Sequence, residues 1–159
     1  MSADLKDYRA ARRAFIAACE KAGVDTIARV HSVKGADGKP LFMDSAALGP
    51  RLARKAVVAI AQDLAGSDAL TRLLHDPVAL PPDTRLVLVH APDPAAFAGA
   101  SGDTRWAQAS LSALATEDLF KVTKPVVLNL NGVLSPLPGA DTVPAQEARA
   151  RILAEFATL

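Results

Sequence analysis

The sequence predicts an α/β fold with a parallel or mixed sheet and helices on both of its faces. Three short, continuous apolar runs, at residues 55–61, 84–91 and 125–131, are typical of strands that are buried on both faces. Segments with helical periodicity alternate with these runs, and this alternation indicates strand–helix–strand units. The 159 residues contain no internal repeat and no low-complexity linker, so we expect a single α/β domain over residues 1–159.

An amphipathic helix and a β-hairpin open the chain. Apolar side chains recur near helical spacing across residues 4–22, with Ser2 or Asp4 as the N-cap and Gly23 as the C-terminal stop. Residues 24–33 are rich in β-branched side chains and predict a strand, and residues 41–46 predict its return strand. Two glycines in the intervening turn, residues 34–39, can adopt the positive φ that a tight turn requires.

Local signals predict the remaining elements. We expect a loop at residues 62–66, followed by a helix over residues 68–75 that Ser67 caps. Helical spacing predicts another helix over residues 104–120, and Pro144 favours the start of a last helix over residues 144–156. The stretches 95–103 and 132–143 are rich in glycine, alanine or proline and are predicted to be loops.

The composition excludes several classes of protein. Half of the residues are hydrophobic, 33 of them are alanine and only 4% of the chain is aromatic, so Leu, Val and Ile must build the core. The chain is too apolar to be disordered, and it has no apolar run long enough to span a membrane. A single cysteine excludes a disulfide framework, and with three histidines we expect no metal site and no cofactor.

The charge is small overall but unevenly distributed. A net charge of +1 gives no reason to expect a nucleic-acid or membrane partner. Residues 1–55 carry eleven Lys and Arg against six Asp and Glu, whereas residues 56–159 carry seven against eleven. The basic third either faces an acidic partner or forms the solvated face of the first helix. The first residues do not resemble a signal peptide, so we expect a cytoplasmic location.

Candidate catalytic residues lie at the carboxyl ends of the apolar strands, where α/β folds usually place their sites. Asp63 follows the first of these strands, and His90 and Asp93 close the second. A histidine three residues from an aspartate can form a general-base pair if the turn brings the two together. No suitable nucleophile is adjacent in the sequence, and G-x-S-x-G is absent. Both residues equally suit structural roles, in the strand and in the turn that follows it.

A second group of residues suits ligand binding. Gly66 and Ser67 open a predicted helix, whose free backbone amides can bind an anion. Gln62 and Asn131 follow the first and third apolar strands and offer amide side chains. The competing interpretations are that Ser67 is only an N-cap and that Asn131 belongs only to an Asn-Gly turn. The glycine motifs of nucleotide-binding proteins are absent.

Four motifs occur in a fixed order over roughly residues 5–98. Residues 8–18 match Y-x-x-A-R-x-x-F-x-x-A, and residues 31–41 follow H-P-L-x-G-x-D-G-x-x-L at His31, Gly35, Asp37, Gly38 and Leu41. Residues 44–50 match D-x-A-x-L-G-P, and residues 89–97 match V-H-A-x-N-P-x-x-F with Asp93 at the asparagine position. Together they resemble a domain-of-unknown-function family of bacterial proteins in the zinc carboxypeptidase superfamily. The resemblance implies a truncated carboxypeptidase-like core.

The chain departs from that family where the family binds zinc. There the first apolar strand runs into S-G-T-H-G-V-E-G-F-x-G-S, whose H-x-x-E supplies two zinc ligands. Here Ile60-Ala61-Gln62 leads directly to Asp63, and neither the histidine nor the glutamate is present. The family's D-x-N-R stretch is also not visible, and its third ligand comes from a much later segment. Zinc peptidase chemistry requires a Lewis acid and a metal-activated water, so the resemblance implies a shortened relative without metallopeptidase activity.

Three functions remain open. The first is a non-catalytic, zinc-carboxypeptidase-like pseudoenzyme that acts as a binding or assembly module, with a protein partner or a second copy of the chain. The second is a metal-independent enzyme with a cleft at the strand ends, formed by Gln62, Asp63, His90 and Asp93. The third is a small-ligand or anion binder that uses Gly66, Ser67 and Asn131. We favour the first.

Overall fold

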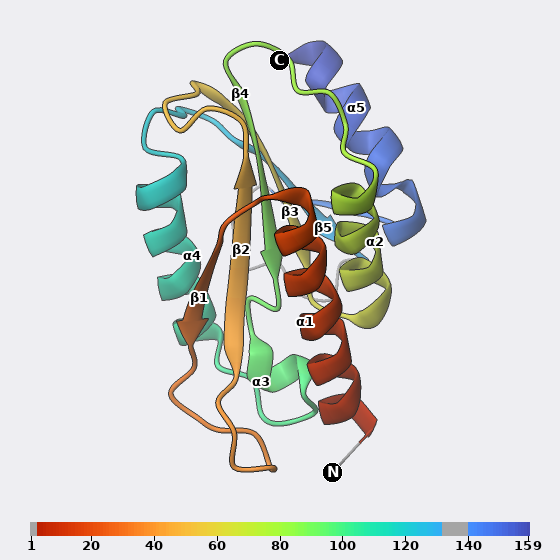
Figure 1. Ribbon diagram of the computed structural model, residues 1–159. Helices are drawn as coiled ribbons and strands as arrows, with labels where there is room; N and C mark the ends of the chain where they lie inside the picture. Colours follow the sequence, from red (N-terminus) through yellow and green to blue (C-terminus); the bar gives the residue numbers. More distant parts are fainter. Residues whose placement is uncertain (1–2, 132–139) are drawn as a thin grey trace.

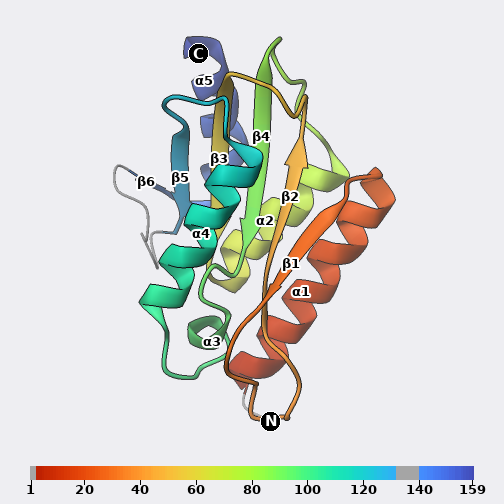
Figure 2. The same ribbon diagram turned by 90° about the vertical axis from the view of Figure 1, so that its left-hand side faces the viewer.

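A computed structural model describes residues 3–131 and 140–159, which form a six-stranded mixed sheet between two layers of helices (Figures 1 and 2). The antiparallel part consists of β1, β2 and β4, and the parallel part of β4, β3, β5 and β6. The predicted fold class is therefore confirmed. The spatial order is β1 (Thr26–Val30), β2 (Phe42–Leu48), β4 (Thr84–His90), β3 (Lys55–Ala61), β5 (Val126–Leu130) and β6 (Asp141–Val143).

The two faces of the sheet are covered by different helices. Helices α1 (Ala3–Ala22), α2 (Leu64–His75) and α5 (Ala148–Thr158) pack on one face, and α4 (Thr104–Asp118) packs on the other. Figure 2 shows α4 in front of the sheet and α1 and α2 behind it. Alternate residues of β3 and β4 therefore enter two separate cores, as their continuous apolar sequences predict. None of the described helices combines the length and the apolar character that crossing a membrane requires.

Several predicted boundaries are confirmed by the structure. Helix α1 buries Leu5, Tyr8, Phe15 and Cys19 on one face and ends before Gly23, whose φ of +69° closes the helix. The hairpin of β1 and β2 is antiparallel as expected. Strand β3 coincides with its predicted range, and β4 ends one residue before the predicted limit.

Four predictions made from local signals are wrong. Helix α2 begins at Leu64 and not at Asp68, because Asp63 rather than Ser67 is its N-cap. Residues 95–97, within the predicted loop 95–103, belong to the short helix α3 (Pro94–Phe97), which Asp93 caps. Within the predicted loop 132–143, Asp141–Val143 pairs with β5 as β6, whereas residues 132–139 and Ser2 lie outside the described residues. A 3₁₀ turn, η1 (Ala145–Glu147), precedes α5, so the last helix starts later than predicted.

A buried ion pair joins α1 to the sheet. The guanidinium of Arg12 donates two hydrogen bonds to the carboxylate of Asp44 on β2, from Nε at 2.7 Å and from Nη2 at 2.9 Å. The side chain of Asp44 is fully buried, whereas that of Arg12 is 26% exposed. One turn earlier, the Tyr8 hydroxyl donates to the Phe42 carbonyl and accepts from the Phe42 N–H. These contacts hold α1 in register with β2.

Removing the carboxylate of Asp44 should destabilise the fold strongly. The variant Asp44→Ala leaves a half-buried guanidinium without its partner, and breaking such a pair costs about 3–5 kcal/mol. Urea denaturation of the purified chain measures this change. The matched control is Asp68→Ala, which removes an exposed i,i+4 pair with Arg72 and should cost about 0.3–0.5 kcal/mol. Equal losses in the two variants would contradict the structural role of Asp44.

Candidate functional site

The topology defines where a ligand crevice would lie in this sheet. The chain leaves β3 towards β4 on one side, and it leaves β5 towards β6 on the other. Adjacent parallel strands whose connections diverge in this way create a crevice outside their carboxyl ends. The crevice of this fold therefore belongs between the ends of β3 and β5, next to Asp63 and Asn131.

Asp63 and Asn131 meet at this position and hydrogen-bond to each other. The Nδ2 of Asn131 donates to the Asp63 carboxylate at 3.1 Å, and the Ala145 N–H donates to the side-chain Oδ1 of Asn131 at 2.8 Å. Asn131 has a φ of +62°, a conformation that asparagine tolerates better than most residues. The two predicted site residues thus connect β3, β5 and the start of η1.

The helix start that would bind an anion is already occupied by Asp63. The Gly66 N–H donates to the Asp63 carboxylate at 2.8 Å, and the Ser67 N–H donates to the Asp63 carbonyl at 2.9 Å. A Cβ on Gly66 would lie 3.0 Å from that carboxylate and 3.1 Å from the Cβ of Ala61. A side chain at this position would have to displace one of these neighbours, so glycine suits a helix that begins so close to the end of β3. The carboxylate occupies the place that an external anion would take.

Gln62 and Asp93 also form a pair. The Gln62 side chain donates to the Asp93 carbonyl at 2.6 Å and accepts from the Asp93 N–H at 3.0 Å. The Asp93 carboxylate accepts the N–H groups of Ala96 and Asp103, so it caps α3 and holds the segment before α4. Both residues are buried. Their polar groups connect the ends of β3 and β4 to the chain that follows.

His90 lies in the core beneath α1 rather than in a cleft. Its Nε2 is 2.9 Å from the Ser67 hydroxyl, and its ring stacks on Phe15 with a centroid separation of 5.2 Å. Nδ1 has no hydrogen-bond partner among the described residues. Burial, together with the positive charge of Arg12, lowers the pKa of His90 to about 3. The imidazole is therefore neutral at physiological pH.

The hydrogen bonds made by their side chains divide the seven predicted site residues into three groups. Gln62 pairs with Asp93, Asp63 with Asn131 and Gly66, and Ser67 with His90. The sequence did not predict the Ser67–His90 contact, since Ser67 was expected to cap the helix and not to lie inside it. The one feature of the sequence that could have predicted this contact is the helical register of α2. Because α2 starts at Leu64, Ser67 lies on the same face of the helix as Leu70 and Leu74, towards the sheet. Both partners are buried, so this hydroxyl–imidazole pair is inaccessible to a substrate.

The residues present do not fit a zinc site. In the described part of the chain, no three His, Cys, Asp or Glu side chains lie close enough together to hold one metal ion. The donors at the end of β3 are an amide, in Gln62, and a carboxylate, in Asp63, that already accepts two hydrogen bonds. Burial raises the pKa of the Cys19 thiol to about 11, so it stays protonated.

A groove of about 610 Å³ lies on the helical face of the sheet. It runs between α2 and the η1–α5 segment and is lined by residues such as Ala69, Leu73, Gln146 and Arg149. None of the seven predicted site residues lines it. The groove therefore runs along the helical face, and Ala65 and Ala145 bring one end of it next to Gly66 and Asn131.

Comparisons with known proteins identify a family and a fold. A family model described as "Protein of unknown function (DUF2817)" matches residues 5–102, nearly the same segment that carries the four motifs. No curated protein matches the chain. Solved structures with a similar fold include two glutaminyl cyclases and one aminopeptidase.

The glutaminyl cyclase of Fimbriiglobus ruber is 13% identical over 75% of this chain and 52% of its own, with a TM-score of 0.51. The glutaminyl cyclase of Macrostomum lignano is 16% identical over 77% of this chain and 45% of its own, with a TM-score of 0.49. The LapA aminopeptidase of Legionella pneumophila is 14% identical over 79% and 36%, with a TM-score of 0.46. The chain spans about half the length of the first structures it matches, and the likeness extends to the fold alone.

The burial of His90 predicts a specific loss of stability in mild acid. The unfolded chain protonates this histidine below pH 6.5, whereas the folded chain does not, so the unfolded state binds more protons. Between pH 7.5 and pH 5 the unfolding free energy should fall by about 2 kcal/mol through this group. Denaturant unfolding at several pH values measures the slope.

The variant His90→Gln removes the titrating group and should flatten the slope over this range. If that variant does not fold, NMR titration of the wild-type ring gives the same information, because His90 should remain neutral at pH 5. Protonation of the folded-state ring near pH 6.5 would contradict its burial.

Proposed function

The chain belongs to the DUF2817 family of proteins of unknown function, and we propose that it is a non-catalytic, zinc-carboxypeptidase-like member that acts as a binding or assembly module. The observation that carries this proposal is the chain of hydrogen bonds at the topological switch point. The place where this fold would hold a ligand contains the Asp63–Asn131–Ala145 contacts.

The neighbouring polar groups support the same conclusion. A catalytic group needs a free hydrogen-bonding position directed at the substrate. The carboxylates of Asp63 and Asp93 each accept two hydrogen bonds from the protein, and His90 and Ser67 are buried against each other. These side chains stabilise the turns after β3, β4 and β5. The names of the similar structures, glutaminyl cyclase and aminopeptidase, suggest that the fold is one that elsewhere carries an active site.

The edge strand β1 is the surface that we assign to assembly. It ends the sheet, and no described strand pairs with its outer edge. Three aliphatic side chains on it or just beyond it are exposed: Ile27 at 44%, Val30 at 58% and Val33 at 54%. An edge strand with exposed apolar side chains is a template for pairing with another strand. Antiparallel pairing of two β1 strands around a two-fold axis would join two copies of the chain.

Zinc loading tests the non-catalytic part of the proposal. The purified chain, incubated with zinc and desalted, should retain far less than one zinc per molecule in elemental analysis. It should also show no aminopeptidase, carboxypeptidase or glutaminyl cyclase activity. The variant Asp63→Asn keeps a residue that caps helices but removes the carboxylate, so it should leave both results unchanged. Stoichiometric zinc together with peptide hydrolysis, lost in Asp63→Asn, would refute this part.

The assembly part is tested by the size of the particle in solution. Mass photometry and size exclusion should show a dimer, and the double variant Ile27→Lys/Val30→Lys should convert it to a monomer, because it charges the paired edge. The matched control is Leu153→Lys, which charges an aliphatic side chain of α5 that is also 44% exposed. A wild-type monomer, or a dimer that persists in the double variant, would refute pairing through β1.

A further inference from the structure

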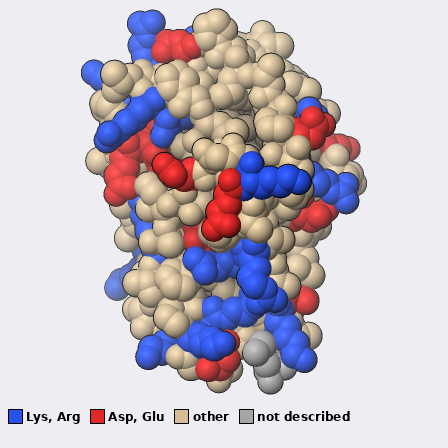
Figure 3. Space-filling model, in the orientation of Figure 1, with Lys and Arg blue, Asp and Glu red and all other residues tan. Residues whose placement is uncertain are grey.

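A small cleft lined only by charged side chains lies between α1 and the loop that joins β1 to β2. Its volume is about 220 Å³, and its lining consists of Lys6, Arg9, Arg13, Asp37 and Lys39. The space-filling view shows Lys and Arg side chains gathered over the N-terminal half of α1 and the tip of this loop (Figure 3). Four cations and one carboxylate therefore face a single concave space.

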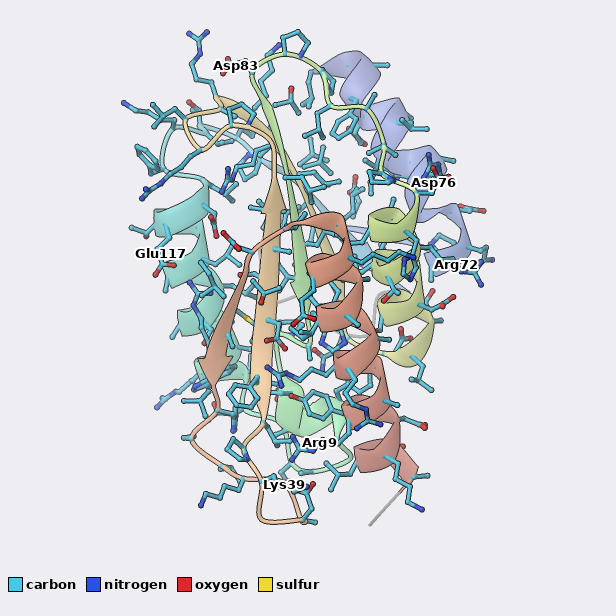
Figure 4. The ribbon with its side chains drawn as sticks, viewed as in Figure 1. Arg9, Lys39, Arg72, Asp76, Asp83 and Glu117 are labelled. Carbon is cyan, nitrogen blue, oxygen red and sulfur yellow. The ribbon has the colours of Figure 1, made fainter. Side chains whose placement is uncertain are left out.

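Arg9 is the fixed centre of this cleft. Its Nε and Nη2 donate to the two carboxylate oxygens of Asp37, at 3.1 and 2.9 Å, and it also donates to the carbonyls of Lys39 and Pro40. Figure 4 shows Arg9 on α1 and Lys39 at the tip of the loop, at the same end of the molecule. The loop is thus tied to the helix, and a Cβ on Gly35 would lie 2.8 Å from the Asp37 carboxylate, so a side chain there would displace the carboxylate that Arg9 binds.

The cleft carries a surplus of positive charge. Asp37 is neutralised by Arg9, and that hydrogen bond lowers the pKa of the carboxyl, so it stays ionised and engaged. Lys6, Arg13 and Lys39 are exposed and form no ion pair within the described residues. Three cationic groups thus surround a space whose single carboxylate is already paired. Because the loop is anchored through Arg9, Lys39 is held opposite Lys6 and Arg13 without further ordering of the backbone.

The lining favours a compact anion over a protein segment. Protein partners bind mainly through aromatic or aliphatic side chains buried in pockets, whereas every residue that lines this cleft is charged and its apolar surface is that of lysine and arginine stems. Lysine and arginine side chains that converge on one space suit the oxygens of a phosphate group, which accept charge-assisted hydrogen bonds. We propose that this cleft is a binding site for a multivalent phosphate, with Lys6, Arg13 and Lys39 as the donors. The inference goes beyond the proposed function, since the cleft lies apart from both the strand ends and the outer edge of β1.

Calorimetric titration of the full chain with sodium tripolyphosphate at low ionic strength tests this assignment. We expect saturable binding that weakens as salt is added, and weaker binding of inorganic phosphate, which carries less charge. The double variant Arg13→Gln/Lys39→Gln should lose about tenfold or more in affinity. The matched control is Lys21→Gln/Lys124→Gln, which removes the same charge from two exposed lysines outside the cleft and should bind as the wild type does.

Two results would overturn the proposal. One is an equal loss of affinity in the two double variants, which would mean that net charge alone determines binding. The other is tighter binding of a hexaglutamate peptide than of tripolyphosphate, which would assign the surface to an acidic protein segment. Neither result depends on zinc content, peptidase activity or oligomeric state, so the inference and the proposed function fail independently.

Discussion

The buried ion pair between Arg12 and Asp44 fixes the position of α1, and much of the structure depends on that position. A fully buried carboxylate is costly unless a cation and hydrogen bonds compensate for its lost hydration. Arg12 supplies both, and it can do so only when α1 lies across β2 at this height. Phe15, from the next turn of α1, then covers the ring of His90 on β4, directly beside Asp44 in the sheet.

The residues that carry the family resemblance meet in this cluster. Tyr8, Arg12 and Phe15 come from the first motif, Asp44 from the third and His90 from the fourth, and they contact one another across α1, β2 and β4. The motifs therefore specify how a helix is attached to a sheet. This explains how a chain can match the family over residues 5–102 and still lack the H-x-x-E that the resemblance associates with zinc.

The sequence predicts more of the fold than of the candidate site. The buried strands β3 and β4 follow from continuous apolar runs, a signal that their own residues contain. The pairing of Gln62 with Asp93, or of Asp63 with Asn131, depends on which strands are neighbours, and no local pattern contains that information. The position of Ser67 was predicted wrongly because Asp63 and Ser67 are both residues that cap helices well. With Asp63 as the N-cap, α2 starts one turn earlier and Ser67 lies inside the helix. β6 is too short for a periodic signal.

The switch point and the cleft beside α1 differ in whether their polar side chains have hydrogen-bond partners within the chain. At the switch point, the side chains that could act on a ligand have their hydrogen bonds supplied from within the chain. Beside α1, Lys6, Arg13 and Lys39 form no ion pair within the described residues, and the one carboxylate of their cleft, Asp37, is paired with Arg9. Groups whose hydrogen bonds are made within the chain stabilise a fold, whereas exposed groups without such partners are available to another molecule. The phosphate site that we propose therefore lies on the α1 side, within the basic first third of the chain that a net charge of +1 conceals.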